Sequence, residues 1–188
     1  MKTLNIFGST GIIGAKSLFI IKNYFPEIKI NLLVAKKNYK KLIEQAIIYK
    51  PKYVCLTDKS KILILKKELR NTKIRILIYE DLIDYLKKNI SDLTILSISG
   101  YDSLNFIQSI IINTKILGIV NKECIVAGGN LINKLCSLYK TKLYPLDSEH
   151  FSIQNFFNNK IINDSCSIKN IFLTASGGPF LNKKYNDI

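Results

Sequence analysis

The sequence has no tryptophan, one histidine and only two arginines, Arg70 and Arg75. Nucleic-acid-binding proteins rely on arginine for bidentate contacts with bases and phosphates. The scarcity of arginine therefore argues against a nucleic-acid partner, although the formal net charge is +14. The lysines that carry this charge are spread along the chain, as expected for solvated helix faces.

Long apolar runs are also missing. No run approaches the roughly 20 residues of a membrane-spanning helix, so we expect no membrane partner. A strand-like run, Leu4–Phe7, follows the first methionine almost at once, which leaves no visible signal or transit peptide. We therefore expect a cytoplasmic protein, or one from a plastid-type organelle if a transit peptide has been removed.

The sequence has few cysteines, and they do not occur in closely spaced pairs. The four cysteines are Cys55, Cys124, Cys136 and Cys166. No two of them form a C-x-x-C motif, which argues against a zinc site or a redox pair. The pattern indicates reduced thiols in the core of a protein from a reducing compartment.

Apolar strand-like runs alternate with amphipathic helix-like segments along most of the 188 residues. This alternation predicts an α/β fold, with a Rossmann-like doubly wound parallel sheet. The expected strands are Leu4–Phe7, Lys29–Val34, Tyr53–Leu56, Ile74–Ile78, Leu93–Ile98, Ile116–Val120, Lys140–Tyr144 and Ile168–Leu173. The expected helices include Tyr39–Tyr49, Asp58–Arg70, Asp81–Lys88, Leu104–Asn113 and Phe151–Phe157. Ligands of such sheets bind at the carboxyl ends of the strands.

A glycine turn, Gly8–Gly14, separates the first strand from the first helix. Glycines at this spacing let the backbone approach a pyrophosphate at the helix N-terminus, although the bare motif also arises by chance. The second strand is followed by Lys36, Lys37 and Asn38, where NAD-binding proteins carry an acidic residue. The lysines would favour a 2′-phosphate, and so NADPH. Alternatively, they are surface residues of a helix that Asn38 caps.

Polar residues also follow a later strand, at Asn121, Lys122 and Glu123. Asn121 and Glu123 could contact a nicotinamide ribose, and Lys122 an anionic substrate. The alternative is a helix cap followed by an acid in the first helical turn, where negative charge is favourable. The glycines Gly128 and Gly129 then interrupt the helix, and indicate either close packing or a kink.

The stretch Pro145–His150 places two carboxylates, Asp147 and Glu149, just past a strand. Such oxygen ligands suit Mg²⁺ or Mn²⁺. They can share one ion only if the backbone is extended or turning, because residues i and i+2 diverge on a helix. Alternatively, Asp147 or Ser148 caps a helix that begins near Phe151.

A last motif, Ser176–Phe180, offers a hydroxyl and free backbone N–H groups to a phosphate, or is a plain glycine turn.

Four stretches in this order resemble the 1-deoxy-D-xylulose 5-phosphate reductoisomerases, over essentially the whole chain. They are Gly8–Gly11, Asn121–Glu123, Pro145–His150 and Ser176–Phe180. The last two are specific to the family. The resemblance implies isomerisation of 1-deoxy-D-xylulose 5-phosphate and its reduction with NADPH to 2-C-methyl-D-erythritol 4-phosphate, in non-mevalonate isoprenoid biosynthesis. It also implies an NADPH-binding Rossmann-like domain over residues 1–144 and the start of a mixed α/β catalytic domain over 145–188.

The resemblance assigns roles to individual residues. Asp147 and Glu149 would bind the divalent ion, with Co²⁺ as a further candidate, and would act in catalysis together with Lys122. The implied contacts to the small phosphorylated sugar are Lys122, Ser148, Glu149 and, on the phosphate, Ser176. The implied contacts to NADPH are Thr10, Gly11, Ile12, Ile13, Lys36, Lys37, Asn38, Asn121 and Glu123.

The chain departs from the family at three places. Ile12 replaces a usual serine, Lys36 replaces a usual glycine, and Ser99–Leu104 differs from the family's small-residue turn. The family also continues beyond residue 188, with a third metal carboxylate and a helical domain, and is dimeric. We therefore expect an incomplete chain that is inactive alone and forms a homodimer at full length.

Two other functions fit the sequence. A different NADP-dependent dehydrogenase could share only the nucleotide-binding unit, and would bind NADPH without needing a metal. A non-catalytic nucleotide- or nucleic-acid-binding remnant would instead exploit the positive charge, and would bind duplexes in a salt-dependent way.

Overall fold

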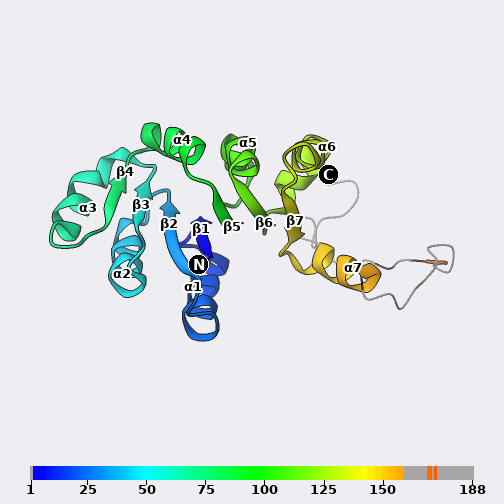
Figure 1. Cartoon of the computed structure of the whole chain (residues 1–188), viewed down its shortest axis with the longest axis horizontal. Helices are drawn as coiled ribbons and strands as arrows, with labels where there is room; N and C mark the ends of the chain where they lie inside the picture. The colour runs from blue at the N-terminus through cyan, green and yellow to red at the C-terminus, as the bar shows by residue number, and fades with distance from the viewer. Residues whose placement is uncertain (1, 159–168, 171, 173–188) are drawn as a thin grey trace, which may run out of the picture. The chain divides into compact units, whose positions relative to one another are not determined.

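The structure is a computed structural model and describes residues 2–158, 169, 170 and 172. The chain divides into two compact units, one ending at Asp147 and the other beginning at Ser148. In the first unit, strands alternate with helices (Figure 1). The predicted strand Ile168–Leu173 and the Ser176–Phe180 motif lie largely or wholly outside the described residues.

The first unit is built on seven strands. They are β1 (Thr3–Phe7), β2 (Lys29–Ala35), β3 (Tyr53–Leu56), β4 (Arg75–Leu77), β5 (Ser91–Leu96), β6 (Thr114–Ile119) and β7 (Lys142–Pro145). Six α-helices connect them: α1 (Ile12–Tyr24), α2 (Tyr39–Tyr49), α3 (Ile62–Leu69), α4 (Tyr79–Lys88), α5 (Leu104–Ile112) and α6 (Lys122–Tyr139). Two 3₁₀ turns, η1 (Lys59–Lys61) and η2 (Tyr101–Ser103), precede α3 and α5.

The strands form one sheet in the order β4-β3-β2-β1-β5-β6-β7, and every neighbouring pair is parallel. This confirms the predicted doubly wound parallel sheet. The chain moves outward from β1 in one direction through β2, β3 and β4. It then returns to the other side of β1 with β5. The carboxyl ends of β1 and β5 therefore form the topological switch point, where ligands bind in open α/β sheets.

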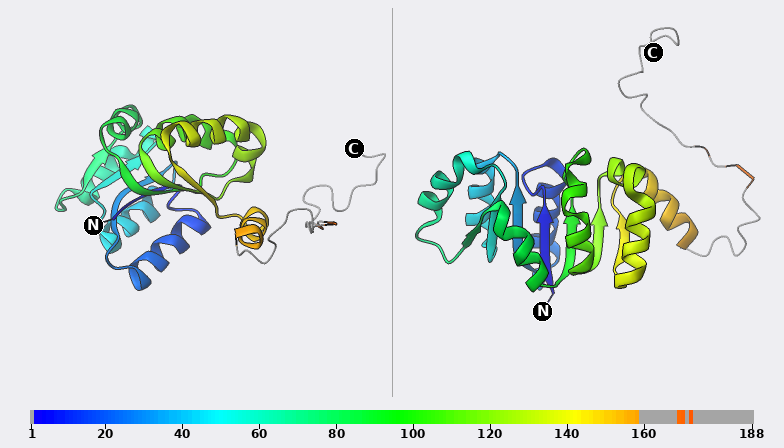
Figure 2. Two further views of the ribbon diagram at one scale, coloured as in Figure 1. Left: turned by 45° about the vertical axis from the view of Figure 1, so that its right-hand side comes forward. Right: turned by 90° about the horizontal axis from the view of Figure 1, so that it is seen from above.

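Helices cover both faces of the sheet (Figure 2). One buried cluster joins the strands to α1, α2 and α3 through residues such as Leu18, Leu42 and Leu65. The other joins them to α4, α5 and α6 through residues such as Leu82 and Ile110. Because both faces are buried, the strands read in the sequence as nearly continuous apolar runs.

Two element boundaries differ from the prediction. Asp58 is the predicted cap, since its carboxylate accepts from the Ser60 N–H at 2.9 Å, but the segment that it caps is η1, and α3 follows in place of one helix that runs to about Arg70. In the second unit, helix α7 (Ser148–Asn158) begins three residues before Phe151. An aspartate directly before the first helical residue, and a glutamate in the first turn, both favour this earlier start.

Helix α6 runs through Gly128 and Gly129 without a break. A Cβ added to Gly128 would lie 3.2 Å from Leu104 Cδ2, at the start of α5. Of the two explanations predicted for these glycines, the structure supports close packing at Gly128.

The turn between β1 and α1 leaves no room for a side chain at Gly8 or Gly14. Gly8 has φ +81°, and a Cβ there would lie 2.6 Å from the Ser97 carbonyl oxygen. A Cβ on Gly14 would collide with the Gly8 carbonyl oxygen and lie 2.7 Å from Ser9 Cα. These neighbours are backbone atoms, so they cannot move aside cheaply.

We predict that Gly14→Ala lowers the free energy of unfolding by about 1–3 kcal/mol, because the turn must shift to admit the methyl group. Urea unfolding measures this. Gly129→Ala is the matched control within a helix: its Cβ would lie 3.7 Å from Ile125 Cγ2, an ordinary contact. The control should gain up to about 1 kcal/mol from helix propensity. Equal gains for both variants would contradict the packing argument.

Asp92 joins three strands at the opposite end of the sheet. Its carboxylate accepts from the Thr3 N–H at 2.9 Å, from Thr3 Oγ1 at 3.0 Å and from Lys115 Nζ at 2.7 Å. The Lys115 ammonium, and after it the Thr3 N–H, lower the pKa of Asp92 from its ordinary 3.8 to about 2. The charged carboxylate therefore stabilises the folded state above pH 3.8, and this stabilisation is lost as the pH falls towards 2.

We predict that Asp92→Asn costs about 1 kcal/mol at pH 7, a value reduced by solvent screening because the side chain is 28% exposed. The difference from wild type should shrink as the pH approaches 2. Urea unfolding at both pH values tests this. Asp84→Asn is the matched control, because Asp84 is 70% exposed and only 3.4 Å from Lys87. A cost at Asp92 that did not change with pH would contradict the electrostatic explanation.

Candidate functional site

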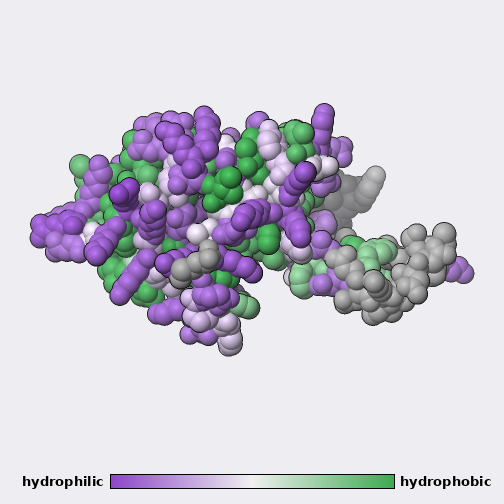
Figure 3. Space-filling model, in the orientation of Figure 1, coloured by the Kyte–Doolittle hydropathy of each residue, from purple (hydrophilic) through white to green (hydrophobic). Residues whose placement is uncertain are grey.

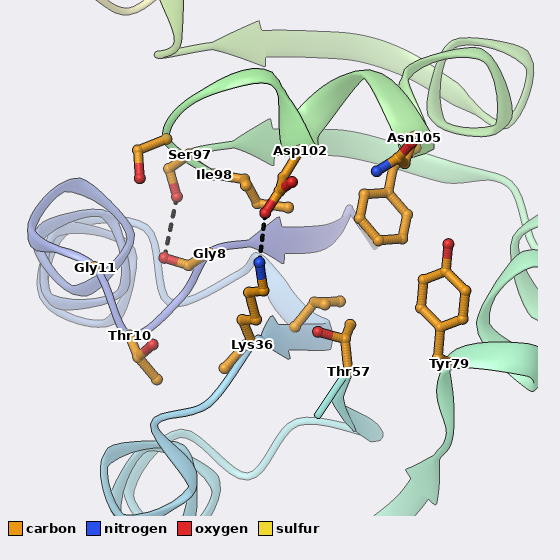
Figure 4. Close-up of a pocket in the computed structure, with 14 residues that line it drawn as sticks. Gly8, Thr10, Gly11, Lys36, Thr57, Tyr79, Ser97, Ile98, Asp102 and Asn105 are labelled. Carbon is orange, nitrogen blue, oxygen red and sulfur yellow. Dashed lines mark hydrogen bonds and ion pairs between the residues drawn. The ribbon is translucent and has the colours of Figure 1, made fainter. Parts of the chain in front are cut away.

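A pocket of about 590 Å³ lies at the switch point of the sheet (Figure 4). Its walls come from segments that directly follow strands: Gly8 follows β1, Lys36 follows β2, Thr57 follows β3 and Ser97 follows β5. The full lining is Gly8, Thr10, Gly11, Val34, Ala35, Lys36, Thr57, Tyr79, Ser97, Ile98, Ser99, Asp102, Asn105 and Phe106. This position makes it the candidate ligand site.

A larger pocket of about 1160 Å³ lies at the other end of the sheet, where Thr3 and Lys29 begin β1 and β2. Its rim carries five lysines: Lys22, Lys29, Lys50, Lys52 and Lys73. Ligands of open α/β sheets bind at the carboxyl ends of the strands, so size alone does not make this pocket the candidate.

The glycine turn places the start of helix α1 at the switch-point pocket, which Gly8, Thr10 and Gly11 line. The Gly8 and Ser9 N–H groups donate to the Val34 carbonyl at 2.9 and 3.0 Å, which fixes the turn against β2. Helix α1 then begins at Ile12 with no acidic residue in its first turn. Within the described residues, no side chain caps this helix. Its N-terminus therefore retains the partial positive charge that attracts phosphate.

Two side chains that the sequence analysis did not identify as site residues hold this turn. Gln45, from α2, is 4% exposed, and its Nε2 donates to the Ser9 carbonyl at 2.7 Å. Ser97 Oγ donates to the Phe7 carbonyl at 2.7 Å. Gln45 stands three residues after Leu42 and next to Ala46, on the apolar side of an amphipathic helix, and a glutamine at such a place is the signal that could have identified it. The place of Ser97 directly after a strand is the corresponding signal for Ser97.

Of the residues predicted to contact the cofactor, Thr10, Gly11 and Lys36 line the pocket. Ile12 and Ile13 open α1 beside it and are 76% and 38% exposed.

Lys36, Lys37 and Asn38 were given two interpretations, as a site for a 2′-phosphate or as surface residues of a helix that Asn38 caps. The structure agrees with a different interpretation for different residues. Lys36 points into the pocket, where its Nζ lies 2.6 Å from Asp102 Oδ2 (Figure 4). This hydrogen bond, together with the charge of Asp102, raises the pKa of Lys36. Asn38 instead caps α2, because its Oδ1 accepts from the Lys41 N–H at 3.2 Å. Lys37 lies between them and is exposed.

Asn121, Lys122 and Glu123 do not line the pocket, although Asn121 contacts the lining residue Ile98. Asn121 caps α6: its Oδ1 accepts from the Cys124 N–H at 2.9 Å. Its Nδ2 donates to the Ile98 and Gly100 carbonyls at 2.6 and 2.5 Å. Lys122 and Glu123 form the exposed first turn of α6. The predicted cap is therefore present, and the cofactor and substrate contacts of these residues stay predictions.

The acidic stretch falls across the boundary between the two units. Asp147 ends the first unit at a bend, and Glu149 lies in the first turn of α7. The extended or turning backbone that a shared metal ion requires is thus present at Asp147 but not at Glu149. Among the described residues, no three His, Cys, Asp or Glu side chains are grouped to hold a metal. The metal role of Asp147 and Glu149 and the substrate contact of Ser148 stay predictions, and Ser176 lies outside the described residues.

Family comparisons cover both units. The family model of 1-deoxy-D-xylulose 5-phosphate reductoisomerase matches residues 4–129. The model of the C-terminal domain of the same enzyme matches residues 143–188.

Curated relatives carry the same name. The reductoisomerase of Pelagibacter ubique is 43% identical over 193 residues, a match that covers 100% of this chain and 49% of the relative. The apicoplastic reductoisomerase of Plasmodium falciparum is 34% identical, and the match covers 97% of this chain and 41% of the relative. The chain thus spans about half the length of the curated relatives it matches.

Solved structures agree in fold. The reductoisomerase from Zymomonas mobilis in complex with NADPH superposes with a TM-score of 0.82 at 28% identity, over 97% of this chain and 48% of that one. A reductoisomerase in complex with magnesium gives a TM-score of 0.81 at 29% identity, over 98% and 48%. Because a family model matches more than half of the chain, as the four motifs predicted, the chain belongs to the 1-deoxy-D-xylulose 5-phosphate reductoisomerase family.

Proposed function

We propose that this chain supplies the nucleotide-binding part of an enzyme that uses NADPH and a divalent metal ion. The enzyme would isomerise 1-deoxy-D-xylulose 5-phosphate and reduce it to 2-C-methyl-D-erythritol 4-phosphate. One observation carries the proposal: the glycine turn, the uncapped start of α1 and Lys36 meet in one pocket at the switch point. Family membership supplies the reaction.

The chemistry of the pocket fits a phosphorylated dinucleotide. The backbone N–H groups of Ile12 and Ile13 would receive the pyrophosphate beside Thr10 and Gly11, and Lys36 and Lys37 the 2′-phosphate. Tyr79 and Phe106 supply aromatic wall for the base. The bound cofactor would supply the hydride, and the protein the orientation.

The donor atoms of the acidic stretch fit a hard cation such as Mg²⁺ or Mn²⁺, with Co²⁺ as a further candidate. Asp147 and Glu149 would hold the ion, which supplies Lewis-acid polarisation of the substrate. Lys122, Ser148 and Ser176 would bind the phosphorylated sugar. Two carboxylates hold an ion weakly, so we propose that residues 1–188 bind the nucleotide without turning the substrate over.

We further propose a cytoplasmic homodimer without nucleic-acid or membrane partners, or a plastid-type location if a transit peptide has been removed. The described cysteines Cys55, Cys124 and Cys136 are free and buried, as in a reducing compartment. Burial, with smaller contributions from Asp81 and Glu80, raises the pKa of the Cys55 thiol to about 12.

Hydrophilic residues are spread over the visible face of the first unit instead of forming one block (Figure 3). None of the helices in the described ranges combines the length and apolarity that a bilayer crossing needs.

We predict that Lys37→Ala weakens NADPH binding about fivefold, the effect of one exposed ion pair, and leaves NADH binding unchanged. Fluorescence titration of each reduced nucleotide measures this. Lys66→Ala, an exposed lysine on α3, is the matched control and should change neither affinity. If the wild-type chain bound neither nucleotide, or if Lys37→Ala weakened both equally, the cofactor assignment would be wrong.

We predict that Asp147→Asn and Glu149→Gln each remove the weak Mn²⁺ binding of the chain, measured by electron paramagnetic resonance. Asp58→Asn serves as the control, because Asp58 caps η1 far along the chain from the acidic stretch. Unchanged Mn²⁺ binding, together with intact NADPH binding, would favour the alternative NADP-dependent dehydrogenase. Duplex DNA binding that weakened steeply with salt would favour the nucleic-acid-binding remnant.

A further inference from the structure

One ion pair crosses the nucleotide pocket. Lys36 directly follows β2, and Asp102 belongs to η2, which follows β5. Strand β1 lies between these two strands in the sheet, so the pair spans the switch point. Figure 4 shows Lys36 Nζ and the Asp102 carboxylate meeting between the Gly8–Gly11 turn and the wall formed by Thr57 and Tyr79.

The backbones on both sides of this pair are fixed. The Lys36 carbonyl accepts from the Asp58 N–H at 3.0 Å. The turn before η2 is held at Gly100, whose carbonyl accepts from the buried Asn121 amide at 2.5 Å and from Ser103 Oγ at 3.1 Å. Motion is therefore confined mainly to the two side chains.

The ion pair between Lys36 and Asp102 is weak enough for another anion to replace Asp102. The Lys36 and Asp102 side chains are 66% and 55% exposed, and ion pairs this close to water are weak. A phosphate dianion carries more charge than a carboxylate and offers three oxygens, so it is the stronger partner for an ammonium group.

A dinucleotide laid across the pocket meets this pair. With its pyrophosphate on the glycine turn, the adenosine ribose lies at the end of the second strand, which here is Lys36. A nucleotide with a 2′-phosphate gives Lys36 a new partner, whereas a nucleotide without one gives it none.

We propose that Asp102 is a positioning residue that weakens nucleotide binding, because its carboxylate holds Lys36 across the pocket until the 2′-phosphate of the incoming nucleotide replaces it. This inference rests on the proposed nucleotide-binding function. It assigns Asp102 a role opposite to that of a cofactor ligand: Asp102 competes with the cofactor for Lys36. A nucleotide that lacks the phosphate must separate the pair without compensation.

The test measures the Kd of NADPH and of NADH for the whole 188-residue chain by fluorescence titration. Asp102→Asn should lower both Kd values by roughly two- to fivefold, the effect of one exposed ion pair. Lys36→Met should raise the Kd of NADPH severalfold yet lower that of NADH, because the obstacle and the phosphate ligand disappear together. In the Lys36→Met background, Asp102→Asn should not change the Kd of NADH further.

Asp84→Asn removes a carboxylate that is 70% exposed, compared with 55% for Asp102, from a lysine pair outside the pocket, and should leave both Kd values unchanged. Two results would show that Asp102 does not compete with the nucleotide for Lys36. One is that Asp102→Asn leaves both Kd values unchanged. The other is that Asp102→Asn lowers the Kd of NADH by the same factor in the wild-type and Lys36→Met backgrounds. If Lys37→Ala still weakened NADPH binding in that case, the proposed function would survive. If the wild-type chain bound neither nucleotide, both proposals would fall.

Discussion

The close approach of the β1 and β5 backbones at Gly8 and Ser97 is the constraint on which the site depends. The positive φ of Gly8 turns the chain off β1 at the point where Ser97 Oγ donates to the Phe7 carbonyl. This contact fixes the floor of the switch-point pocket. Gln45 then fixes the turn from the opposite side, through the Ser9 carbonyl. The N-terminal end of α1 is thus positioned by its neighbours within the chain.

Much of the first unit could be predicted because its local signals are strong. Tyr39–Tyr49 was predicted to the residue, since Asn38 caps the helix and the left-handed Lys50 before Pro51 ends it. The prediction placed the start of α7 too late. Serine and glutamate suit the first turn of a helix as well as a ligand site, so Ser148 and Glu149 did not by themselves mark the start of the helix.

The candidate site was only partly predictable. Thr10, Gly11 and Lys36 were found because motif and strand-end position coincide. Asp102 was not assigned a role, because the ion pair joins residues 66 positions apart in the sequence and only the sheet order brings them together. Asn38 and Asn121 show the converse limit: an asparagine after a strand fits both a helix cap and a cofactor ligand, and here the cap geometry is present.

The two outer strands of the sheet, β4 and β7, have features that oppose pairing with a foreign strand. Strand β4 is three residues long and begins with the exposed Arg75, and β7 has four residues, of which Lys142 and Tyr144 are exposed. Pro145 ends β7 and has no N–H to offer. Short strands that carry charge and proline are poor templates for pairing with a foreign strand. Arg75, Lys142 and Pro145 therefore make the two outer strands of this sheet poor partners for a foreign strand.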